Sequence, residues 1–569
     1  MTSQSYIHRP HTTPLEHRTL FQLLDHHAAK CPNKEALIYR DDSGNRTALT
    51  FREYKDQSQA LAAGLLEKGL RRGDRVLVLL SNSVEFAVIL LALTRLGAVP
   101  LFVELDVDDA ILEMRGQVSG VFYTEQDSKV ITAVTEVLDS EIKIFLCIGS
   151  HDNMPNHKKV HSYDALLQSF QDDDITQLHQ AETEVQFDDP ALVIFTSGST
   201  GRPKPILYTH HGFVNGALSV VHTFKATHDT IQFCDAPFDW IPGIGFSLAL
   251  VSILGMTLVA FPPNLSIKGH VIGIMLKIIS EERCTHAIML TYVMLDMVRY
   301  EGLPQLDLSQ LKVCITGGQL TDQHLMSKVF SALPDLTSIV NSYGSTETFL
   351  PSGQVVTRHN IHSLDYGATE VNPGFEVKVV DDEGHVVPVG TPGELHVRGA
   401  GILQSANGVR MEGVVYEEKT PTGWYPSKDL SKITNDGRVR ILGRKDCLIK
   451  SATESIYPPE VESVLGKHEK IASIIAIGIP DQRLGEVVCA CVIIKPGFHG
   501  DNKAVIQEID EWCAPKFYVS SNGMTPQPKK YVILENFPKT RTGKVDRKAL
   551  KNIAIQKLGL MKDCGVNIS

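Results

Sequence analysis

The sequence predicts an α/β protein with a large N-terminal lobe of strand–helix units, sheets and a β-rich subdomain, followed by a small α+β lobe at the C-terminus. Three observations predict this arrangement. The chain of 569 residues is too long for one hydrophobic core of ordinary size. Short apolar strands recur through its first part, and the pattern changes after residue 366 and again after residue 446.

The first clear strand–helix unit lies at residues 74–97. The segment DRVLVLL, residues 74–80, is short, apolar and rich in β-formers. Ser81 or Asn82 can then cap a helix whose apolar residues recur at helical spacing up to Leu93, and Gly97 ends that helix. We therefore expect a βα unit here.

Three further apolar strands, each leading to glycine, repeat this pattern. They are ALVIF at 191–195, LKVCITGG at 311–318 and TSIVNSYG at 337–344. The loops at the carboxyl ends of such strands are where α/β proteins bind their ligands. These three strand ends are therefore the predicted ligand-binding edge.

The character of the sequence changes in its last third. FEVKVVDDEGHVVPVG, which begins at Phe375, and GELHVRG at 393–399 alternate like antiparallel strands joined by Asp/Gly turns. After GRVRILGRKD, the segment YPPEVESVL begins a helix-and-strand tail at Tyr457. We place the lobe boundary near Gly443 to Asp446, which predicts domains at residues 1–443 and 444–569.

Charge and composition limit the class of partner. Hydrophobic residues make up 43% of the chain and charged residues 21%, which is ordinary for a globular protein. The formal net charge of −11 argues against nucleic acid or an anionic membrane as the main partner, because both favour basic surfaces. Small molecules or proteins are the expected partners, and the oligomeric state is left open.

Cysteines and targeting signals indicate a reducing compartment. The ten cysteines are scattered, and the closest pair, Cys489 and Cys491, alternates onto one face of a predicted strand. Buried free thiols are expected rather than disulfides. The N-terminus lacks the apolar core of a secretory signal, no apolar run could span a bilayer, and the C-terminal VNIS is not a peroxisomal signal. The cytoplasm is the expected location, with organelle targeting left open.

The stretch TSGSTGRPKP, residues 196–205, has the chemistry of a phosphate-binding loop. Its glycines let backbone N–H groups surround an anion, its hydroxyl groups donate further hydrogen bonds, and Arg202 and Lys204 supply positive charge. It is not a Walker loop, because Lys204 does not directly follow a glycine. Alone, the stretch could equally be a flexible turn.

Six segments that occur in order along the chain favour a phosphate-binding loop over a flexible turn. After TSGSTGRPK come NSYGSTET at 341–348, GELHVRG, GWYPSKDL at 423–430, ILGRKD at 441–446 and PKTRTGKVDRKAL at 538–550. Together they resemble the adenylate-forming (AMP-binding) superfamily, especially acyl-CoA synthetases, over residues 190–550. The resemblance implies an active site between two lobes, a hinge that lets the small lobe turn, and ATP, Mg²⁺ and coenzyme A as cofactors.

The resemblance also implies a reaction in two steps. A carboxylate attacks the α-phosphate of ATP to give an acyl-adenylate and pyrophosphate, and the thiol of coenzyme A then displaces AMP. Such chemistry needs positioning and neutralisation of developing negative charge. The substrate implied is a hydrophobic, fatty or aromatic, carboxylic acid.

The site residues carried over by the resemblance fall into groups by role. Lys544, Thr346 and Glu347 match the catalytic residues, and Glu347 also matches the Mg²⁺ ligand. Asp446 matches the hinge and Trp240 lies at the acyl pocket. The residues expected to bind nucleotide and pyrophosphate are Thr196, Ser197, Gly198, Ser199, Thr200, Gly201, Lys204, Gly317, Gly318, Gln319, Tyr343, Gly344, Asp429 and Arg444. Asp429 and Arg444 would hold the ribose, although, with the motif set aside, a structural salt bridge is an equal alternative for each of these two residues.

The sequence departs from the family pattern at four places. Pro205 replaces the usual glycine after the loop lysine, and Lys428 stands beside Asp429 where GWFRTGD is typical. ATESIYP at 452–458 replaces GGENIYP, so that Ala452 and Thr453 put the coenzyme A step in doubt. Trp240 stands where a gating histidine or aromatic residue is usual, and it could also be part of the core.

Two alternatives to an acyl-CoA ligase stay open. The first is an adenylate-forming enzyme with another second step, either a luciferase-like oxidation or transfer to a carrier thiol. The second is a pseudo-enzyme that binds nucleotide or acyl ligand. The joint presence of Lys544, Glu347, Asp429 and Arg444 argues against the pseudo-enzyme, because a binding-only protein does not need all four roles.

Overall fold

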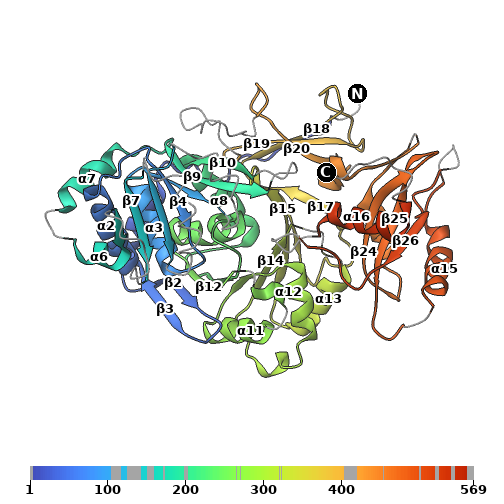
Figure 1. Cartoon of the computed structure of the whole chain (residues 1–569), viewed down its shortest axis with the longest axis horizontal. Helices are drawn as coiled ribbons and strands as arrows, with labels where there is room; N and C mark the ends of the chain where they lie inside the picture. Colours follow the sequence, from blue (N-terminus) through green and yellow to red (C-terminus); the bar gives the residue numbers. More distant parts are fainter. Residues whose placement is uncertain are drawn as a thin grey trace. The chain divides into compact units, whose positions relative to one another are not determined.

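The chain divides into two compact units. A computed structural model describes residues 4–103, 117–124, 142–149, 159–170, 174–197, 203–263, 265–268, 271–318, 321, 323–402, 419–452, 454–498, 501–519, 524–539 and 545–560 (Figure 1). The large unit comprises residues 7–377 and 397–425, and the small unit comprises residues 1–6, 378–396 and 426–569. The domain limits expected from the sequence, 1–443 and 444–569, stay a prediction.

The first sheet of the large unit has seven strands. Its spatial order is β10 (Pro203–Thr209), β9 (Pro190–Ser197), β5 (Val99–Phe102), β4 (Arg75–Leu79), β6 (Gly120–Thr124), β7 (Ile144–Ile148) and β8 (Val160–Ser162). All neighbours are parallel except the edge strand β10, which is antiparallel to β9. Parallel strands joined through helices are the predicted α/β architecture.

The second sheet of the large unit carries two of the three predicted strand ends, those of β14 and β15, whereas the third, that of β9, lies in the seven-stranded sheet. In spatial order it runs β17 (Ala368–Val371), β16 (Phe349–Val356), β15 (Ser338–Ser345), β14 (Val313–Gly317), β13 (His286–Ile288), β11 (Ile231–Cys234), β12 (Thr257–Ala260), β2 (Glu35–Arg40) and β3 (Arg46–Thr50). Strands β15, β14, β13, β11, β12 and β2 are parallel, so that their carboxyl ends share one edge.

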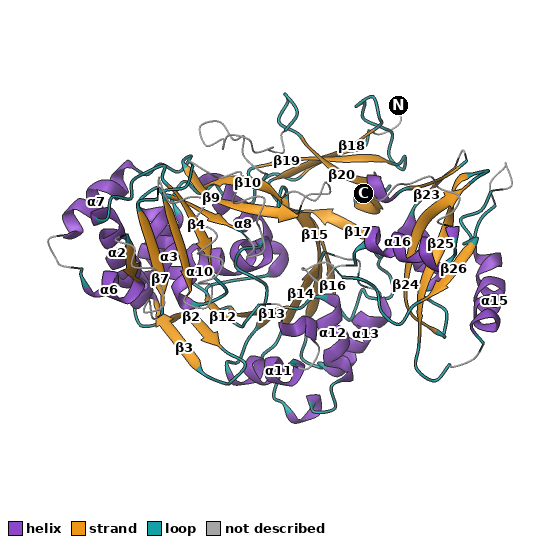
Figure 2. Ribbon diagram, viewed as in Figure 1, coloured by secondary structure: helices purple, strands orange, loops and turns teal. Residues whose placement is uncertain are grey.

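Helices pack against both sheets. The large unit contains α1 (Leu20–Lys30), α2 (Phe51–Glu67), α3 (Val84–Arg95), α6 (Tyr163–Gln168), α7 (Asp174–Glu184), α8 (His210–Phe224), α9 (Ile241–Gly243), α10 (Ala249–Leu254), α11 (Ile272–Glu281), α12 (Thr291–Arg299) and α13 (Gln323–Ala332). Helix α2 contacts α6 and α7 beside the seven-stranded sheet (Figure 2). Helices α11, α12 and α13 bury their apolar faces with residues of β13, β14 and β15 in one core.

The predicted βα unit at 74–97 is present, but its cap differs from the expectation. Strand β4 is followed by α3, and Gly97 takes a φ of +64° just after the helix. Ser83, and neither Ser81 nor Asn82, caps the helix, because its Oγ accepts a hydrogen bond from the Phe86 N–H at 3.1 Å. Asn82 is buried and bonds to a distant loop, a contact that local sequence does not reveal.

Two of the three strands that lead to glycine continue into a second strand rather than a helix. Strand β9 turns back into β10, and β15 turns back into β16, whereas β14 is followed by α13. Pro203 and Pro205 are locally unfavourable for a strand, because proline has no backbone N–H to donate. The structure accommodates them because β10 lies at the edge of its sheet, where a residue without an N–H is tolerated.

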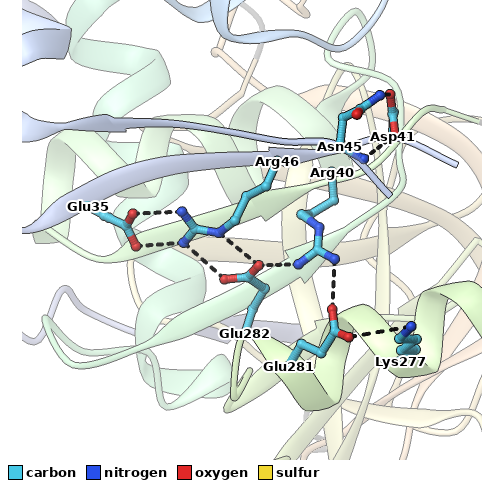
Figure 3. A network of polar contacts seen from close by, with 8 residues as sticks. All are labelled: Glu35, Arg40, Asp41, Asn45, Arg46, Lys277, Glu281 and Glu282. Carbon is cyan, nitrogen blue, oxygen red and sulfur yellow. Dashed lines mark hydrogen bonds and ion pairs between the residues drawn. The ribbon is translucent and has the colours of Figure 1, made fainter. Parts of the chain in front are cut away.

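An ion-pair network ties the β2–β3 hairpin to the end of α11 (Figure 3). The Arg46 guanidinium pairs with Glu35 at 2.8 Å and with Glu282 at 3.0 Å. Arg40 pairs with the same Glu282 and, at 2.7 Å, with Glu281. Glu282 is thus shared by two arginines, and its carboxylate is the centre of the network.

The small unit contains a five-stranded sheet covered on both faces. Its strands are β22 (Ile449–Ser451), β23 (Glu454–Ile456), β24 (Ile471–Asp481), β25 (Gly485–Ile494) and β26 (Lys530–Ile533), and its helices are α14 (Pro458–Leu465), α15 (Asn502–Cys513) and α16 (Arg547–Lys557). Figure 1 shows α15 and α16 on opposite sides of this sheet. One core lies under α14 and α15, and the other lies under α16.

The cysteine prediction is confirmed within the described residues. Cys489 and Cys491 face the same core under α16, and the nine cysteines that the structure describes are free thiols. Across the described ranges, each helix is too short or too polar to cross a bilayer.

A second group of strands surrounds the predicted lobe boundary. The strands β18 (Phe375–Val380), β19 (Gly393–Gly399), β20 (Tyr425–Ile433) and β21 (Val439–Arg444) are neighbours in this order, and β1 (Tyr6–His8) lies beside β18. Strands were predicted at FEVKVV and GELHVRG, and both are present. The short helix η5 (Lys445–Cys447) follows β21.

Candidate active site

Strands β14 and β15 bring two of the predicted nucleotide-binding positions together. Gly317 ends β14 and is the register partner of Ser342, which precedes Tyr343 on β15. A Cβ atom on Gly317 would lie 2.8 Å from the Ser342 carbonyl oxygen, so the close approach of the strands requires glycine. Gly318 follows with a φ of +78°, which turns the chain away from the sheet. Gln319 lies outside the described residues.

The predicted catalytic pair Thr346 and Glu347 lies in the turn between β15 and β16. The Ser345 N–H donates to Thr348 Oγ1 at 3.1 Å, and the Thr348 N–H donates back to the Ser345 carbonyl at 3.2 Å. The Tyr208 hydroxyl on β10 donates a short hydrogen bond to the Thr346 carbonyl oxygen. The turn is therefore fixed both by its own residues and by a strand of the other sheet.

An aromatic cluster packs around the C-terminal end of the same turn. Phe349, the first residue of β16, is fully buried with a φ of +55°, which is unusual for a residue with a bulky side chain. Its ring packs at centroid distances of 5.2 Å on Tyr208 and 5.6 Å on Phe213. Cβ atoms on Gly216 and Gly245 would come within 2.9 and 3.0 Å of that ring. Sequence reasoning missed this cluster, because only the fold brings its members together.

Glycine is also required at Gly344, just before the turn. A Cβ atom there would lie 1.8 Å from the Phe349 carbonyl oxygen. Burial, and after it the nearby Glu347 carboxylate, raises the pKa of Tyr208 well above its ordinary value of 10.0. Tyr208 therefore stays a neutral hydrogen-bond donor at neutral pH.

Glu347 has the chemistry of a magnesium ligand. Its side chain is half-buried, and within the described part of the chain no hydrogen bond or ion pair engages its carboxylate. Carboxylate oxygens are the hard ligands that Mg²⁺ prefers, and this ion is usually held by one or two carboxylates together with substrate phosphates. No group of three His, Cys, Asp or Glu side chains that could hold a metal exists among the described residues. The Glu347 carboxylate fits the role of a single protein ligand to an Mg²⁺ ion that substrate phosphates would also hold.

The predicted pyrophosphate loop is the connection of the β9–β10 hairpin. Thr196 is in register with Lys204, and Ser197 with Pro203, so the two strands fix both ends of the loop. The positions Gly198, Ser199, Thr200 and Gly201 lie outside the described residues, as does Arg202. Pro205 replaces the family glycine, and it lies within β10 opposite Phe195.

Trp240 lines a small pocket in the large unit. It directly precedes α9, and Gly243 at the end of that helix is packed so closely that a Cβ atom would lie 2.0 Å from the Pro237 carbonyl oxygen. The pocket also contains Ile288, which ends β13, and Leu290, which precedes α12. Trp240 therefore lies at a pocket near strand ends, and its role in an acyl pocket stays a prediction.

In the small unit, Asp429 and Arg444 lie together. They are register partners on the antiparallel strands β20 and β21, and Arg444 Nη1 is 3.5 Å from Asp429 Oδ1. Arg444 Nη1 also donates to the Ser427 carbonyl at 3.3 Å, and its Nε is 3.7 Å from Asp446 Oδ1. The predicted ribose residues and the predicted hinge residue thus form one cluster, in which the carboxylate of Asp429 is the more buried partner.

At two positions where the family pattern has glycine, this chain has another residue but keeps a backbone conformation that is typical of glycine. Lys428 has a φ of +62° and Ala452 a φ of +51°. Ala452 lies in the turn between β22 and β23, where Ser451 pairs with Glu454, and its N–H donates to the Leu484 carbonyl at 2.7 Å. Thr453 lies outside the described residues.

Lys544 also lies outside the described residues, but the chain on both sides of it is anchored. Lys539 and Val545 form a β-bridge. Arg547, at the start of α16, donates to Glu462 Oε1 and to the Ala476 carbonyl, both at 2.7 Å. Sequence reasoning did not single out Arg547 or Glu462, because no local pattern links two residues that are 85 positions apart.

Comparison with known families and proteins gives a consistent result. The family described as AMP-binding enzyme matches residues 24–405, and the AMP-binding enzyme C-terminal domain matches residues 460–544. The mitochondrial medium-chain acyl-CoA ligase ACSF2 of Danio rerio is 27% identical, with 98% of this chain and 91% of the relative covered. The acyl-CoA ligase SID4 of Ajellomyces capsulatus is 26% identical, with 97% and 94% covered.

Solved structures show the same fold. The anthranilate CoA ligase AuaEII in complex with anthranoyl-AMP superposes with a TM-score of 0.79 at 22% identity, over 96% of this chain and 99% of that one. A benzoate CoA ligase from Burkholderia xenovorans LB400 gives a TM-score of 0.74 at 19% identity, over 94% and 100%. Because the first family model alone matches more than half of the sequence, the chain belongs to the adenylate-forming AMP-binding enzyme family that its motifs resemble.

Proposed function

We propose that this chain is an ATP-dependent acid–thiol ligase of the acyl-CoA synthetase type. It activates a hydrophobic, fatty or aromatic, carboxylic acid as the acyl-adenylate and then forms the coenzyme A thioester. The chain carries both domains of the AMP-binding enzyme family, and relatives that align over nearly its whole length are named acyl-CoA ligases.

One structural observation carries the proposal. The Thr346–Glu347 turn is fixed by Tyr208 and Phe349, yet the Glu347 carboxylate is engaged by no hydrogen bond or ion pair among the described residues. A rigid turn that presents a carboxylate without a partner, at the carboxyl ends of parallel strands, is suited to a ligand and not to stability.

In the first step, a carboxylate oxygen of the acid attacks the α-phosphorus of ATP. A new bond forms between that oxygen and phosphorus, the bond from the α-phosphorus to the bridging oxygen breaks, and pyrophosphate leaves. Lys544 neutralises charge on the carboxylate and the α-phosphate, and the hairpin loop from Thr196 to Lys204 binds the leaving pyrophosphate. Bound Mg²⁺ supplies further charge neutralisation, and Thr346 and Glu347 would hold it.

Two groups of residues are assigned to the nucleotide in this proposal. Tyr343 stacks on adenine, and Gly317, Gly318, Gln319 and Gly344 allow the backbone to approach the adenine and the acyl group. Asp429 accepts hydrogen bonds from the ribose hydroxyls, and Arg444 reaches the same sugar. These roles agree with the close packing at Gly317 and with the Asp429–Arg444 contact.

In the second step, the sulfur of coenzyme A attacks the acyl carbon and AMP leaves with the electron pair of the broken C–O bond. We infer that the small lobe turns about Asp446 between the steps and brings the turn at Ala452 and Thr453 to the thiol. The left-handed backbone at Ala452 favours retention of this step, because the residue keeps the conformation that glycine provides in the family pattern.

The location of the protein is part of this proposal. A cytoplasmic enzyme was expected from the N-terminus, whereas the ACSF2 relatives are named as mitochondrial. Acid, ATP and coenzyme A are the partners of the proposed reaction, and neither a nucleic acid nor a membrane is needed for it.

The test is a panel of acids from acetate to long-chain and aromatic members, with ATP and Mg²⁺, in the presence and absence of coenzyme A. The expected result is pyrophosphate release that depends on an apolar acid, and thioester formation when coenzyme A is added. Absence of pyrophosphate with every acid would overturn the assignment as an enzyme. Pyrophosphate without thioester would replace the second step by oxidation or by transfer to a carrier thiol.

A further inference from the structure

The pocket beside Trp240 contains an acidic side chain in mostly apolar surroundings. Asp235 and Tyr292 supply its charged and phenolic groups, and the rest of its lining comes from Ala236, Pro237, Trp240, Pro242, Ile288 and Leu290. Asp235 directly follows β11, and Ile288 ends the neighbouring parallel strand β13. The pocket therefore lies at the strand edge that also carries Gly317, since β14 is the next strand.

Asp235 is buried at an energetic cost. Only 6% of the residue is exposed, and among the side chains that the structure describes no cation pairs with it. Burial raises the pKa of Asp235 from its ordinary value of 3.8 to about 6, and a hydrogen bond with Ser266 partly opposes this rise. Ser266 Oγ lies 3.2 Å from the Tyr292 hydroxyl, so the three side chains form a chain of polar contacts.

The fold does not use the Asp235 carboxylate to shape this loop. Asn82 already fixes the loop through its side chain, which donates to the Ala236 carbonyl at 2.9 Å and accepts from the Phe238 N–H at 2.8 Å. Both bonds go to the loop backbone. An apolar residue at position 235 would avoid the cost of burying a carboxylate, so the acid has another use.

The size of the pocket limits what reaches Asp235. Its cavity volume is about 10 Å³, which is room for roughly one water-sized group and far less than the roughly 300–1,000 Å³ of a site for a whole small molecule. It therefore holds one end of a ligand. A carboxylate on its wall can accept hydrogen bonds on two oxygens, and Ser266 engages only part of that capacity.

We propose that Asp235 determines substrate specificity by accepting a hydrogen bond from a hydroxyl or amino group on the apolar body of the acid, away from the reacting carboxylate. This inference rests on the proposed ligase function and names its substrate class: an acid that is apolar along most of its length but carries one hydrogen-bond donor. Trp240 and Leu290 contact the apolar part of the acid, and Asp235 accepts the hydrogen bond from its donor group.

The physical reason for discrimination is the unmet hydrogen-bonding capacity of a buried acceptor. An acid without the donor would displace water from Asp235 and leave its carboxylate poorly paired, which costs more than the loss of an apolar contact. Discrimination of about 10- to 100-fold in kcat/KM is therefore expected between matched acids, below the largest values known for hydrogen-bonding sites because Ser266 already pairs with Asp235.

The experiment compares matched sets of acids that differ in one group. Each set contains an unsubstituted acid, its hydroxy acid and its amino acid, over straight chains from butanoate to dodecanoate with the group at the far end, and over benzoate with the group on the ring. The measurement is kcat/KM for thioester formation by the full chain, for wild type, Asp235→Asn, Asp235→Leu and the exposed control Asp42→Asn.

Within the set of acids that it uses with the highest kcat/KM, wild type should prefer an acid that carries the donor over the unsubstituted acid. Asp42→Asn should keep that preference. Asp235→Leu should reverse it in favour of the unsubstituted acid. Asp235→Asn should keep a preference for the hydroxy acid and for the ring-substituted amino acid, whose donor groups are neutral, because its amide oxygen still accepts. It should lose any preference for the straight-chain amino acid, whose amino group is cationic. These two outcomes separate a neutral donor from a cationic one.

Equal use of matched acids by wild type within about twofold would overturn the proposal, even if Asp235→Leu did not fold. In the straight-chain sets, the same ratio in wild type and Asp235→Asn for both the hydroxy and the amino acid would also overturn it, since Asp235 would then be structural. Failure of the ligase function itself gives a different result, in which no acid of any set yields pyrophosphate.

Discussion

The hydroxyl group of Tyr208 donates a hydrogen bond to the backbone carbonyl of Thr346. Tyr208 lies on β10, the strand that follows the predicted pyrophosphate loop, and Thr346 lies in the turn that presents Glu347. One buried hydrogen bond therefore joins the two elements that would handle the triphosphate from opposite sheets of the large unit.

Replacement of Tyr208 by Phe should loosen this connection. The Thr346 carbonyl would lose its buried partner, and we expect a loss of about 1–3 kcal/mol in the free energy of unfolding. The requirement for Mg²⁺ should rise as well, because Glu347 would be less well positioned. Urea unfolding and the magnesium dependence of pyrophosphate release measure the two effects.

Tyr366→Phe is the matched control, because the Tyr366 hydroxyl also donates to a backbone carbonyl, that of Ile361, at 2.9 Å. It should reduce stability without a change in magnesium dependence. If the two variants behave alike, the Tyr208 hydrogen bond has no special role at the site.

Replacement of Glu347 by Gln keeps the size of the side chain but removes its charge. If Glu347 holds Mg²⁺, the variant should need much more Mg²⁺ for half-maximal activity and should fold normally. Titration of pyrophosphate release with Mg²⁺ measures this, and the exposed Glu383→Gln serves as control. An unchanged magnesium requirement would refute the assignment.

Replacement of Lys544 by Ala should separate the two half-reactions. Loss of a charge that acts mainly in the transition state costs about 3–5 kcal/mol, so adenylation should slow by about 10²- to 10⁴-fold. With preformed acyl-adenylate, thioester formation should stay near the wild-type rate. Lys548→Ala, an exposed position of the same basic segment, should affect neither step. Equal slowing of both steps by Lys544→Ala would exclude a division of labour between them.

A bulky residue at position 453 should give the opposite pattern. In Thr453→Trp the turn at Ala452 would carry a large side chain where the thiol is expected to approach. Adenylation should proceed normally, and thioester formation from acyl-adenylate should be slow. Thr434→Trp, in the turn between β20 and β21, controls for added bulk in the small unit. Normal thioester formation by Thr453→Trp would show that this turn does not meet the thiol.

The Glu282 network should make stability depend on pH. Burial alone would raise the pKa of Glu282, but hydrogen bonds from Arg46 and Arg40 outweigh burial and lower it below the ordinary value of 4.5. Its contribution to stability is therefore present above the pKa of the unfolded state and is lost as the pH falls through the pKa of the folded state.

The difference in unfolding free energy between wild type and Glu282→Gln should accordingly shrink as the pH falls from about 7 to about 3. The exposed Glu301→Gln should show no such trend. A difference that stays constant over this range would mean that the charge of Glu282 does not stabilise the fold.

The sequence predicted best what local pattern determines. The alternation of residues 74–80 and the helical spacing after them identified β4 and α3, and strand ends placed Gly317 and Tyr343 at one edge. The helix cap was wrong because Ser83 and Asn82 are both suitable cap residues. A contact between Asn82 and the loop at Ala236, 154 residues away, decided between them.

The parts that sequence could not supply depend on long-range packing. Motif order identified Thr346 and Glu347 but not Tyr208 or Phe349, which fix their turn from another strand and through an unusual backbone angle. Asp235 lies close to Trp240 in the sequence, yet nothing in that local sequence showed that it would be buried in a pocket.

The backbone at Lys428 and Ala452 also has a consequence for how such chains are classified. Both residues take positive φ angles at places where the family pattern has glycine. The surrounding strands impose this conformation, at a cost of roughly 1–2 kcal/mol for each residue. Glycine there lowers the energy of the turn but does not create it. A missing motif glycine is therefore weak ground for declaring a homologous chain inactive, and backbone geometry is the better criterion.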